Sequence, residues 1–274
     1  MKKKIWTALL GIAVLGGLWG MTNTAQAATP YKTVKLNWYI ETTLLRSVNA
    51  QKSINIWNRA HTKKLGNLKT YPNVTWTSTA RLHLKHGNTY SWYYRVDGQI
   101  GRNQIKQGYV WHGFMEEGLA NDMLTRRYTG LWLFKRNADY NKYVRLSPSQ
   151  GTTRAILKLF PNSPLTLDLS QIAIIKDGRY SSDDIVLPVM HPKTANYQKL
   201  KTFPTITKYL KKSRNQPTAT RIKQVKKLLA AEDYGAAKRK SLKNYQVGLE
   251  IIDHSSTNKY HDYNGYAFVV AQLK

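Results

Sequence analysis

The hydrophobic pattern changes near the middle of the chain, and this change restricts the fold more than any other feature. From Tyr31 to about Gly118, apolar and polar residues alternate in short runs such as KTVKLNWYI and VTWTSTARLHL, which is the spacing of half-buried β-strands. Beyond Gly118, runs such as RAILKLF and TRIKQVKKLL repeat their apolar residues every three or four positions, as helices do. The chain is therefore predicted to be α+β overall, with a small N-terminal β-barrel followed by an α+β domain.

Turn-forming residues separate the expected strands. Turns are expected at 71–73 (YPN), at 86–88 (HGN) and at 96–101 (VDGQIG), where Asp97-Gly98 supplies the backbone geometry that a tight hairpin requires. The run LWLFK at 131–135 favours a further strand within an otherwise ambiguous segment. In the second half the pattern predicts helices that span about 149–160, begin at Asp168, and cover 205–212 and 220–241, followed by strands over 245–252 and 265–273.

The first residues are typical of a secretory signal peptide. Three lysines precede an apolar stretch, and AQA at 25–27 provides a cleavage site. The expected divisions are a signal peptide at 1–27, a β-rich module at 28–118, a connector at 119–148 and a basic α+β domain at 149–274. The last residues, AFVVAQLK, carry no sorting motif. We therefore expect a secreted protein that stays at the cell wall, or outside the cell, without covalent attachment.

Basic residues greatly outnumber acidic ones. Lysine and arginine total 43 against 15 aspartates and glutamates, which gives a formal net charge of +28. Such a charge attracts polyanions, and export favours teichoic acid, peptidoglycan, an anionic lipid surface or acidic host glycans over nucleic acid. The segment 199–243 alone holds fourteen lysines and arginines and only two acids. Its cations either bind the ligand or form the ordinary solvated face of a core helix; the candidates for binding are Lys226, Lys227, Lys238, Arg239 and Lys240.

Aromatic residues crowd the stretch YSWYYRVDGQIGRNQIKQGYVWHGFM at 90–115. Because the strand at 90–95 reads YSWYYR, rings fall on both of its faces. One face is expected to pack inward, which leaves the rings of the other face for a ligand. The candidate exposed binding residues are Tyr93, Arg95, Tyr109 and Trp111. In the alternative interpretation, Trp57, Trp76, Trp92 and Trp111 all belong to the core.

The segment 54–115 resembles the bacterial SH3-like, GW-type cell-wall-binding modules of secreted surface proteins of lactobacilli and related Firmicutes. The matching features are an early strand that ends in Trp57, the Thr75-Trp76 step, the strand WYYRV at 92–96 and the closing GYVW at 108–111. The family usually closes with Gly-Trp, whereas this chain has Tyr109 after the glycine. The resemblance implies a small β-barrel that binds wall polymers and performs no chemistry. The C-terminal half, at RAILKLFPN, resembles uncharacterised domains of exported proteins, which implies no known activity.

Hydrolytic enzymes need residues that this sequence does not supply in a clear pattern. The chain has no cysteine, which excludes a thiolate nucleophile. Ser-x-x-Lys occurs at 256–259 without the other motifs of penicillin-recognising enzymes, and the acidic residues include no clear pair for glycoside hydrolysis. Several candidate metal ligands surround one polar loop and are better explained as solvated side chains: Asp253, His254, His261 and Asp262. We expect no catalytic residue, no metal site and no cofactor.

These observations favour a non-catalytic secreted surface protein that binds anionic cell-wall polymers, either teichoic acid or peptidoglycan. One alternative is a wall-modifying enzyme whose active site lies in the C-terminal half. The other is an adhesin that binds acidic host glycans through its charge. Turnover of labelled peptidoglycan distinguishes the enzyme, and sedimentation with purified walls, compared with walls stripped of teichoic acid, distinguishes the adhesin.

Overall fold

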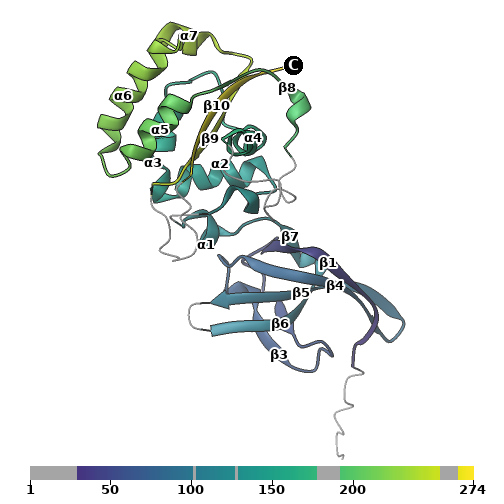
Figure 1. Cartoon of the computed structure of the whole chain (residues 1–274). Helices are drawn as coiled ribbons and strands as arrows, with labels where there is room; N and C mark the ends of the chain where they lie inside the picture. Colours follow the sequence, from purple (N-terminus) through teal and green to yellow (C-terminus); the bar gives the residue numbers. More distant parts are fainter. Residues whose placement is uncertain (1–29, 101–102, 127–128, 178–191, 254–264) are drawn as a thin grey trace, which may run out of the picture.

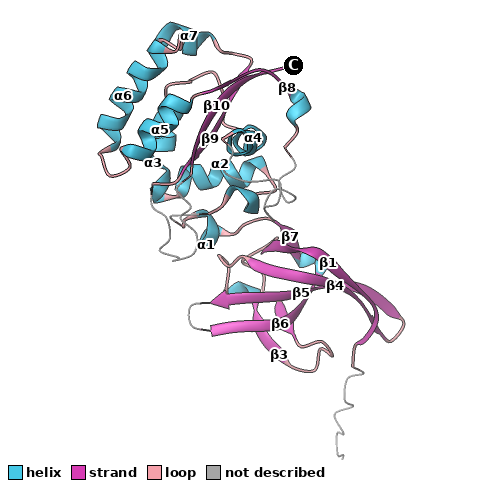
Figure 2. Ribbon diagram, viewed as in Figure 1, coloured by secondary structure: helices cyan, strands magenta, loops and turns pink. Residues whose placement is uncertain are grey.

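The computed structural model describes residues 30–100, 103–126, 129–177, 192–253 and 265–274. Two parts follow one another along the chain: a curled antiparallel sheet, and a part in which helices surround a second sheet (Figure 1). Helices and strands both contribute strongly (Figure 2), as predicted for an α+β chain. Within these ranges we find no helix with the length and apolar character that a membrane span requires.

The first sheet has seven strands in the order β3-β2-β6-β5-β4-β1-β7, and each neighbouring pair is antiparallel. It curls into a half-barrel (Figure 1). The 3-10 turns η1 (Leu68–Thr70) and η2 (His112–Phe114) lie between its strands. The strands are β1 (Lys32–Ser47), β2 (Asn55–Trp57), β3 (Lys64–Asn67), β4 (Trp76–His86), β5 (Thr89–Ile100), β6 (Asn103–Trp111) and β7 (Met115–Glu117).

A β-bulge in β4 places the two hydrophobic clusters of this sheet on opposite faces. Ser78 pairs with Val96 and Ala80 with Arg95, so Thr79 is one extra residue in β4. Because Val96 and Arg95 are neighbours in β5, their side chains point to opposite faces, and their partners in β4 do the same. The first cluster contains Leu45, Ile54, Ile56, Leu68, Trp76, Val96, Val110 and Met115, and the second contains Ala80, Leu82, Leu84 and Tyr109.

The predicted hairpin turn at Asp97-Gly98 is wrong, because both residues lie inside β5. Glycine is needed there for space: a Cβ on Gly98 would lie 2.5 Å from the ring of Trp76. The Asp97 carboxylate accepts a hydrogen bond of 2.7 Å from the backbone N–H of Gln107, which has a left-handed conformation (φ 52°) in β6. Asp97 and Gly98 therefore lie at a register shift between β5 and β6, not in a turn. The turns predicted at 71–73 and 86–88 do separate successive elements.

The second part is built on a three-stranded antiparallel sheet with the order β8-β10-β9. Helix α4 packs closely along β9, because Gly248 leaves room for it: a Cβ there would lie 2.3 Å from the backbone oxygen of Leu169. Helices α5 and α6 lie on the other side of the two long strands (Figure 1). The elements are α1 (Asn121–Leu124), η3 (Leu131–Leu133), α2 (Asn137–Leu146), η4 (Pro148–Gln150), α3 (Gly151–Leu157), α4 (Leu167–Lys176), η6 (Thr194–Asn196), β8 (Tyr197–Thr202), α5 (Pro204–Lys212), α6 (Thr218–Ala231), α7 (Ala236–Ser241), β9 (Tyr245–Ile251) and β10 (Tyr266–Leu273).

Helices α3, α4 and α5 and strands β9 and β10 agree with the prediction, whereas other segments differ from it. The run LWLFK, predicted as a strand, forms η3 and buries Leu131 and Phe134 in the core. The predicted helix at 220–241 is two helices, because Asp233 has a left-handed conformation (φ 64°). The N–H of Tyr234 then donates to the oxygen of Leu229 (2.8 Å), which ends α6 in a Schellman motif. The edge strand β8 was not predicted, because most of its residues are exposed and show no apolar alternation.

Charged side chains connect the curled sheet to the helical part. The side chain of Asp139 in α2 is only 5 % exposed and accepts hydrogen bonds from Arg46 Nη1 of β1 (3.3 Å) and from Arg136 Nε (3.0 Å). Arg46 also pairs with Glu116 of β7 (2.8 Å). Gly118 has a φ of 143°, and a Cβ on it would lie 2.9 Å from the Asp139 carboxylate. We call these residues the junction cluster.

Candidate ligand-binding face

Strand register brings four of the predicted binding residues to one face of the curled sheet. Tyr93 lies opposite Trp111 and Arg95 lies opposite Tyr109 across β5 and β6. Residues directly opposite each other in an antiparallel pair point to the same face, as do residues two apart in one strand. The four side chains therefore form a compact group, with Tyr94 and Val110 on the opposite face.

The same pairing extends this group into two rows that cross the sheet. The first row runs through β1, β4, β5, β6 and β2 and consists of Trp38, Ala80, Arg95, Tyr109 and Trp57. The second row runs through β1, β4, β5 and β6 and consists of Leu36, Leu82, Tyr93 and Trp111. We call the surface that carries these two rows the ring face.

Exposure differs along the ring face. Trp38 is 61 % exposed and Trp111 is 37 % exposed, whereas Tyr93 and Arg95 are half-buried. The prediction of an exposed Tyr109 is wrong, because this side chain is only 6 % exposed and packs in the cluster with the buried residues of β4. The rings of Tyr31 and Tyr93 pack against this cluster.

A cation lies among the rings of the first row. The guanidinium of Arg95 stands over the ring of Trp38, 5.4 Å from its centroid. The Nε atom of Arg95 is buried and has no hydrogen-bond partner among the described residues. Stacking of this kind holds the guanidinium in one orientation.

A pocket of about 220 Å³ opens at one end of the ring face. Its walls combine the rings of Trp111 and Tyr93 with residues from the loops around β2. Lys52 lies at its edge, with its Nζ atom 5.2 Å from the ring centroid of Phe114. The other aromatic lining residues are Tyr31, Trp57 and His61. We call this hollow the ring pocket.

His61 is the most constrained side chain of the ring pocket. It has a left-handed backbone (φ 56°), and its ring lies 3.9 Å from the ring of Tyr31 and 4.7 Å from that of Tyr93, centroid to centroid. Burial among these rings, with a smaller contribution from the nearby His86, lowers the pKa of His61 from 6.5 to about 4. Burial also raises the pKa of Tyr93, to which a hydrogen bond with Tyr31 contributes. The pocket is thus neutral at its floor at physiological pH.

The opposite face of β5 carries a second group of rings. Tyr94 packs against the first hydrophobic cluster, as expected for an inward face. Trp92 instead stacks with His83 (4.6 Å between ring centroids) and lies beneath Arg81, whose guanidinium carbon is 4.5 Å from the ring centroid. Tyr90 is 48 % exposed. One end of this face therefore remains at the surface, contrary to the expectation that the whole face packs inward.

The five basic residues of segment 199–243 that were predicted to bind ligand lie in the helical part, away from the ring face in the fold (Figure 1). Lys226, Lys227, Lys238 and Lys240 are exposed on α6 and α7. Arg239 is different, because it is buried and donates hydrogen bonds to two backbone oxygens, those of Leu159 (3.1 Å) and Tyr234 (2.5 Å). Its role is structural: it holds the start of α7 against the chain that follows α3.

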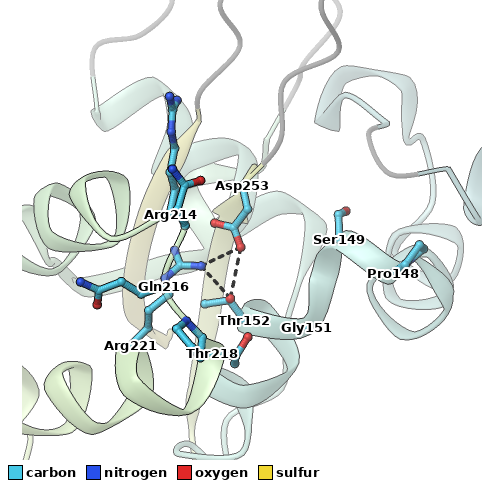
Figure 3. Close-up of a pocket in the computed structure, with 11 residues that line it drawn as sticks. Pro148, Ser149, Gly151, Thr152, Arg214, Gln216, Thr218, Arg221 and Asp253 are labelled. Carbon is cyan, nitrogen blue, oxygen red and sulfur yellow. Dashed lines mark hydrogen bonds and ion pairs between the residues drawn. The ribbon is translucent and has the colours of Figure 1, made fainter.

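A cavity of about 550 Å³ lies in the helical part between η4, α3 and the start of α6 (Figure 3). At its floor, Arg221 Nη1 donates to Asp253 Oδ2 (2.7 Å) and to Thr152 Oγ1 (3.0 Å). Tyr266 donates its hydroxyl to Asp253 Oδ1 (2.9 Å). Burial and the adjacent Asp253 carboxylate raise the pKa of Tyr266, which keeps this donor protonated.

Several residues of the ring face and the ring pocket were not predicted from the sequence. Tyr31, Trp38, Lys52, Trp57 and His61 belong to β1, β2 and the loops beside them, and Phe114 belongs to η2. The aromatic residues Tyr31, Trp38 and Trp57 were visible in the sequence and could have suggested that this segment contributes to the site. Assigning these residues to one site needed the pairing of β1 with β4 and of β2 with β6, which connects segments far apart in the sequence.

No protein-family model, no curated protein and no solved structure matches this chain. The described ranges contain no group of three or more His, Asp or Glu side chains that could hold a metal ion. Some residues considered for catalysis or metal binding lie outside the described ranges: His254, Ser256, Lys259, His261 and Asp262. The ring face and the cavity are therefore the features of the described residues that bear on function.

Proposed function

We propose that this chain is a non-catalytic, secreted surface protein that binds anionic cell-wall polymers, teichoic acid or peptidoglycan, through the ring face and the ring pocket. In this proposal the curled sheet acts as an SH3-like wall-binding module. The observation that carries the proposal is the alignment of rings and a cation in two rows across five strands.

The chemistry of the ring face fits a polymer that alternates sugar or polyol units with negative charges. Aromatic rings offer flat apolar surfaces to the faces of sugars, and the pocket walls offer several such surfaces at once. Arg95 and Lys52 lie beside these rings and can pair with phosphate or carboxylate groups. Exposed lysines of α6 and α7 add attraction at longer range, in keeping with the net charge of +28.

The described lining of the cavity in the helical part lacks the arrangement of residues that a hydrolase needs, which favours binding over hydrolysis. Both oxygens of Asp253 already accept hydrogen bonds, so this carboxylate is occupied as an anchor and is poorly placed to act as a base. Among the described residues that line the cavity, none is a histidine, lysine or glutamate that could activate Ser149 or Thr152. We therefore place the polymer-binding activity on the curled sheet.

The first test is sedimentation of the purified protein with purified cell walls. We expect Trp111→Ala to weaken retention about tenfold, equivalent to about 1.4 kcal/mol, because an exposed ring of the ring pocket is lost. Trp92→Ala is the matched control, because Trp92 belongs to the opposite face of the neighbouring strand. Equal retention of the two variants contradicts the proposal.

Two further comparisons identify the ligand. Walls stripped of teichoic acid should retain less protein if phosphate groups are bound, and retention should fall steeply as salt is raised. Retention that is unchanged by stripping points to peptidoglycan. Binding to acidic host glycans but not to walls would favour an adhesin, and release of soluble wall fragments would favour an enzyme.

A further inference from the structure

We infer a second binding site, for a small phosphate-bearing polyol, in the cavity between η4, α3 and the start of α6 (Figure 3). The cavity has a volume of about 550 Å³, which is in the usual range for sites of small ligands. It lies in the helical part, and the inference does not depend on the function proposed for the ring face.

The floor of the cavity is rigid and polar. Arg221 is 1 % exposed, and its guanidinium is held by Asp253, by Thr152 and by the backbone oxygen of Leu210 (3.0 Å). Its Nε N–H has no acceptor among the described residues. A buried donor without a partner needs an oxygen from a water molecule or a ligand. The floor therefore offers a fixed hydrogen-bonding surface rather than an apolar one.

The rim of the cavity carries the features that favour a phosphate. The charge of Asp253 is neutralised by its ion pair with Arg221, whereas Arg214 at the rim is exposed and has no ion-pair partner among the described residues. The fourteen-residue helix α6 begins at the cavity with Pro217 as its N-cap, and no side chain caps it. Its first backbone N–H groups, beginning with that of Thr218, thus remain available for an anion.

The remaining lining residues favour hydroxyl groups on the ligand. Asn215 and Gln216 carry amides, and Ser149 and Thr218 carry hydroxyls. The described lining contains no aromatic ring, and its other members are two prolines and one glycine. A nucleobase or an apolar ligand would find no stacking partner here, whereas a polyol can exchange hydrogen bonds on several sides.

Glycerol 3-phosphate is a suitable probe, with binding measured by isothermal titration calorimetry on the full chain. We expect saturable binding that glycerol alone does not show and that inorganic phosphate shows at least fivefold more weakly. Arg214→Gln should weaken binding about tenfold through loss of one charged contact. Lys212→Gln, an exposed lysine nearby that does not line the cavity, should bind as the unmodified protein does.

A second pair of variants tests the helix N-terminus separately. Thr218→Pro removes the first N–H of α6, and proline is tolerated at this position because Pro217 already has an extended backbone (φ −55°, ψ 139°). Thr218→Ala removes only the hydroxyl, so Thr218→Pro should bind several-fold more weakly than Thr218→Ala. The inference is overturned if glycerol 3-phosphate does not bind, if Arg214→Gln binds it unchanged, or if inorganic phosphate binds equally well. Trp111→Ala should leave this binding intact.

Discussion

His61 shows how one residue can link the ring pocket to pH. Its imidazole lies among the rings of Tyr31, Trp57 and Tyr93, where a positive charge would lose its hydration. The left-handed backbone at this position keeps the ring directed into the group. Stability and pocket geometry should therefore both depend on the neutral form of this side chain.

We predict that the free energy of unfolding decreases as the pH falls from about 6.5 to about 4. The pKa of His61 is about 4 in the folded protein and 6.5 without these contacts, so the unfolded chain takes up this proton first. Below about pH 4 the contribution of His61 no longer changes, because both states are protonated. Urea unfolding at several pH values measures this slope.

The matched pair for this measurement is His61→Asn and His112→Asn. Asparagine tolerates the left-handed backbone of residue 61 but does not titrate, so the first variant should lose part of the slope. His112 is exposed, and its replacement should leave the slope in place. A slope that is the same in both variants would exclude His61 as its source.

At the scale of elements, helix α4 can pack closely against β9 because residue 248 is glycine and has no side chain. We predict that Gly248→Ala lowers the free energy of unfolding by about 1–3 kcal/mol, because the new Cβ would lie 2.3 Å from the Leu169 oxygen, which belongs to the helix backbone. Gly151→Ala should have the opposite sign. Gly151 is helical (φ −57°, ψ −46°) and an added Cβ meets nothing closer than 3.9 Å, so alanine should stabilise by about 0.4–1 kcal/mol. Thermal or urea unfolding of both variants measures the two stability changes, and changes of the same sign would contradict the prediction.

Elements with a regular apolar period could be predicted from the sequence, and those set by distant contacts could not. Strands β4 and β10 and helix α5 follow their own local pattern. Asp97-Gly98 looks like a turn by composition, but the Trp76 ring and the N–H of Gln107 determine its actual place. The ring face follows the same rule. Its residues were recognisable as aromatic or basic, but their shared face depends on pairing between strands and on the bulge at Thr79.

At the scale of the whole molecule, the junction cluster couples the two parts. We predict that Asp139→Asn lowers the free energy of unfolding by about 1.5–3 kcal/mol, because the guanidiniums of Arg46 and Arg136 lose their shared, buried carboxylate but keep Glu116 as a partner. Glu116→Gln should cost about 1 kcal/mol at most, since the Glu116 side chain is 41 % exposed and its pairs are screened by water.

Denaturant unfolding of the two variants, followed by tryptophan fluorescence, gives this comparison directly. If the cluster couples the curled sheet to the helical part, Asp139→Asn should also broaden the transition or divide it in two. Equal losses in the two variants would mean that Asp139 is no more important than a surface acid. Replacement at this site leaves the ring face unchanged in composition, so wall retention at low denaturant concentration should persist.

The extra residue in β4 has a consequence for how ligand preference can change. Removing Thr79 would leave Ser78 opposite Val96 and Ala80 opposite Arg95, so each neighbour keeps its partner and its side of the sheet. What changes is the bend of the strand, since bulges increase local twist. The spacing and tilt of the ring-face tryptophans can thus be changed at a single backbone position, which would fit the proposed polymer site to a thicker or straighter ligand without replacing any residue of that site.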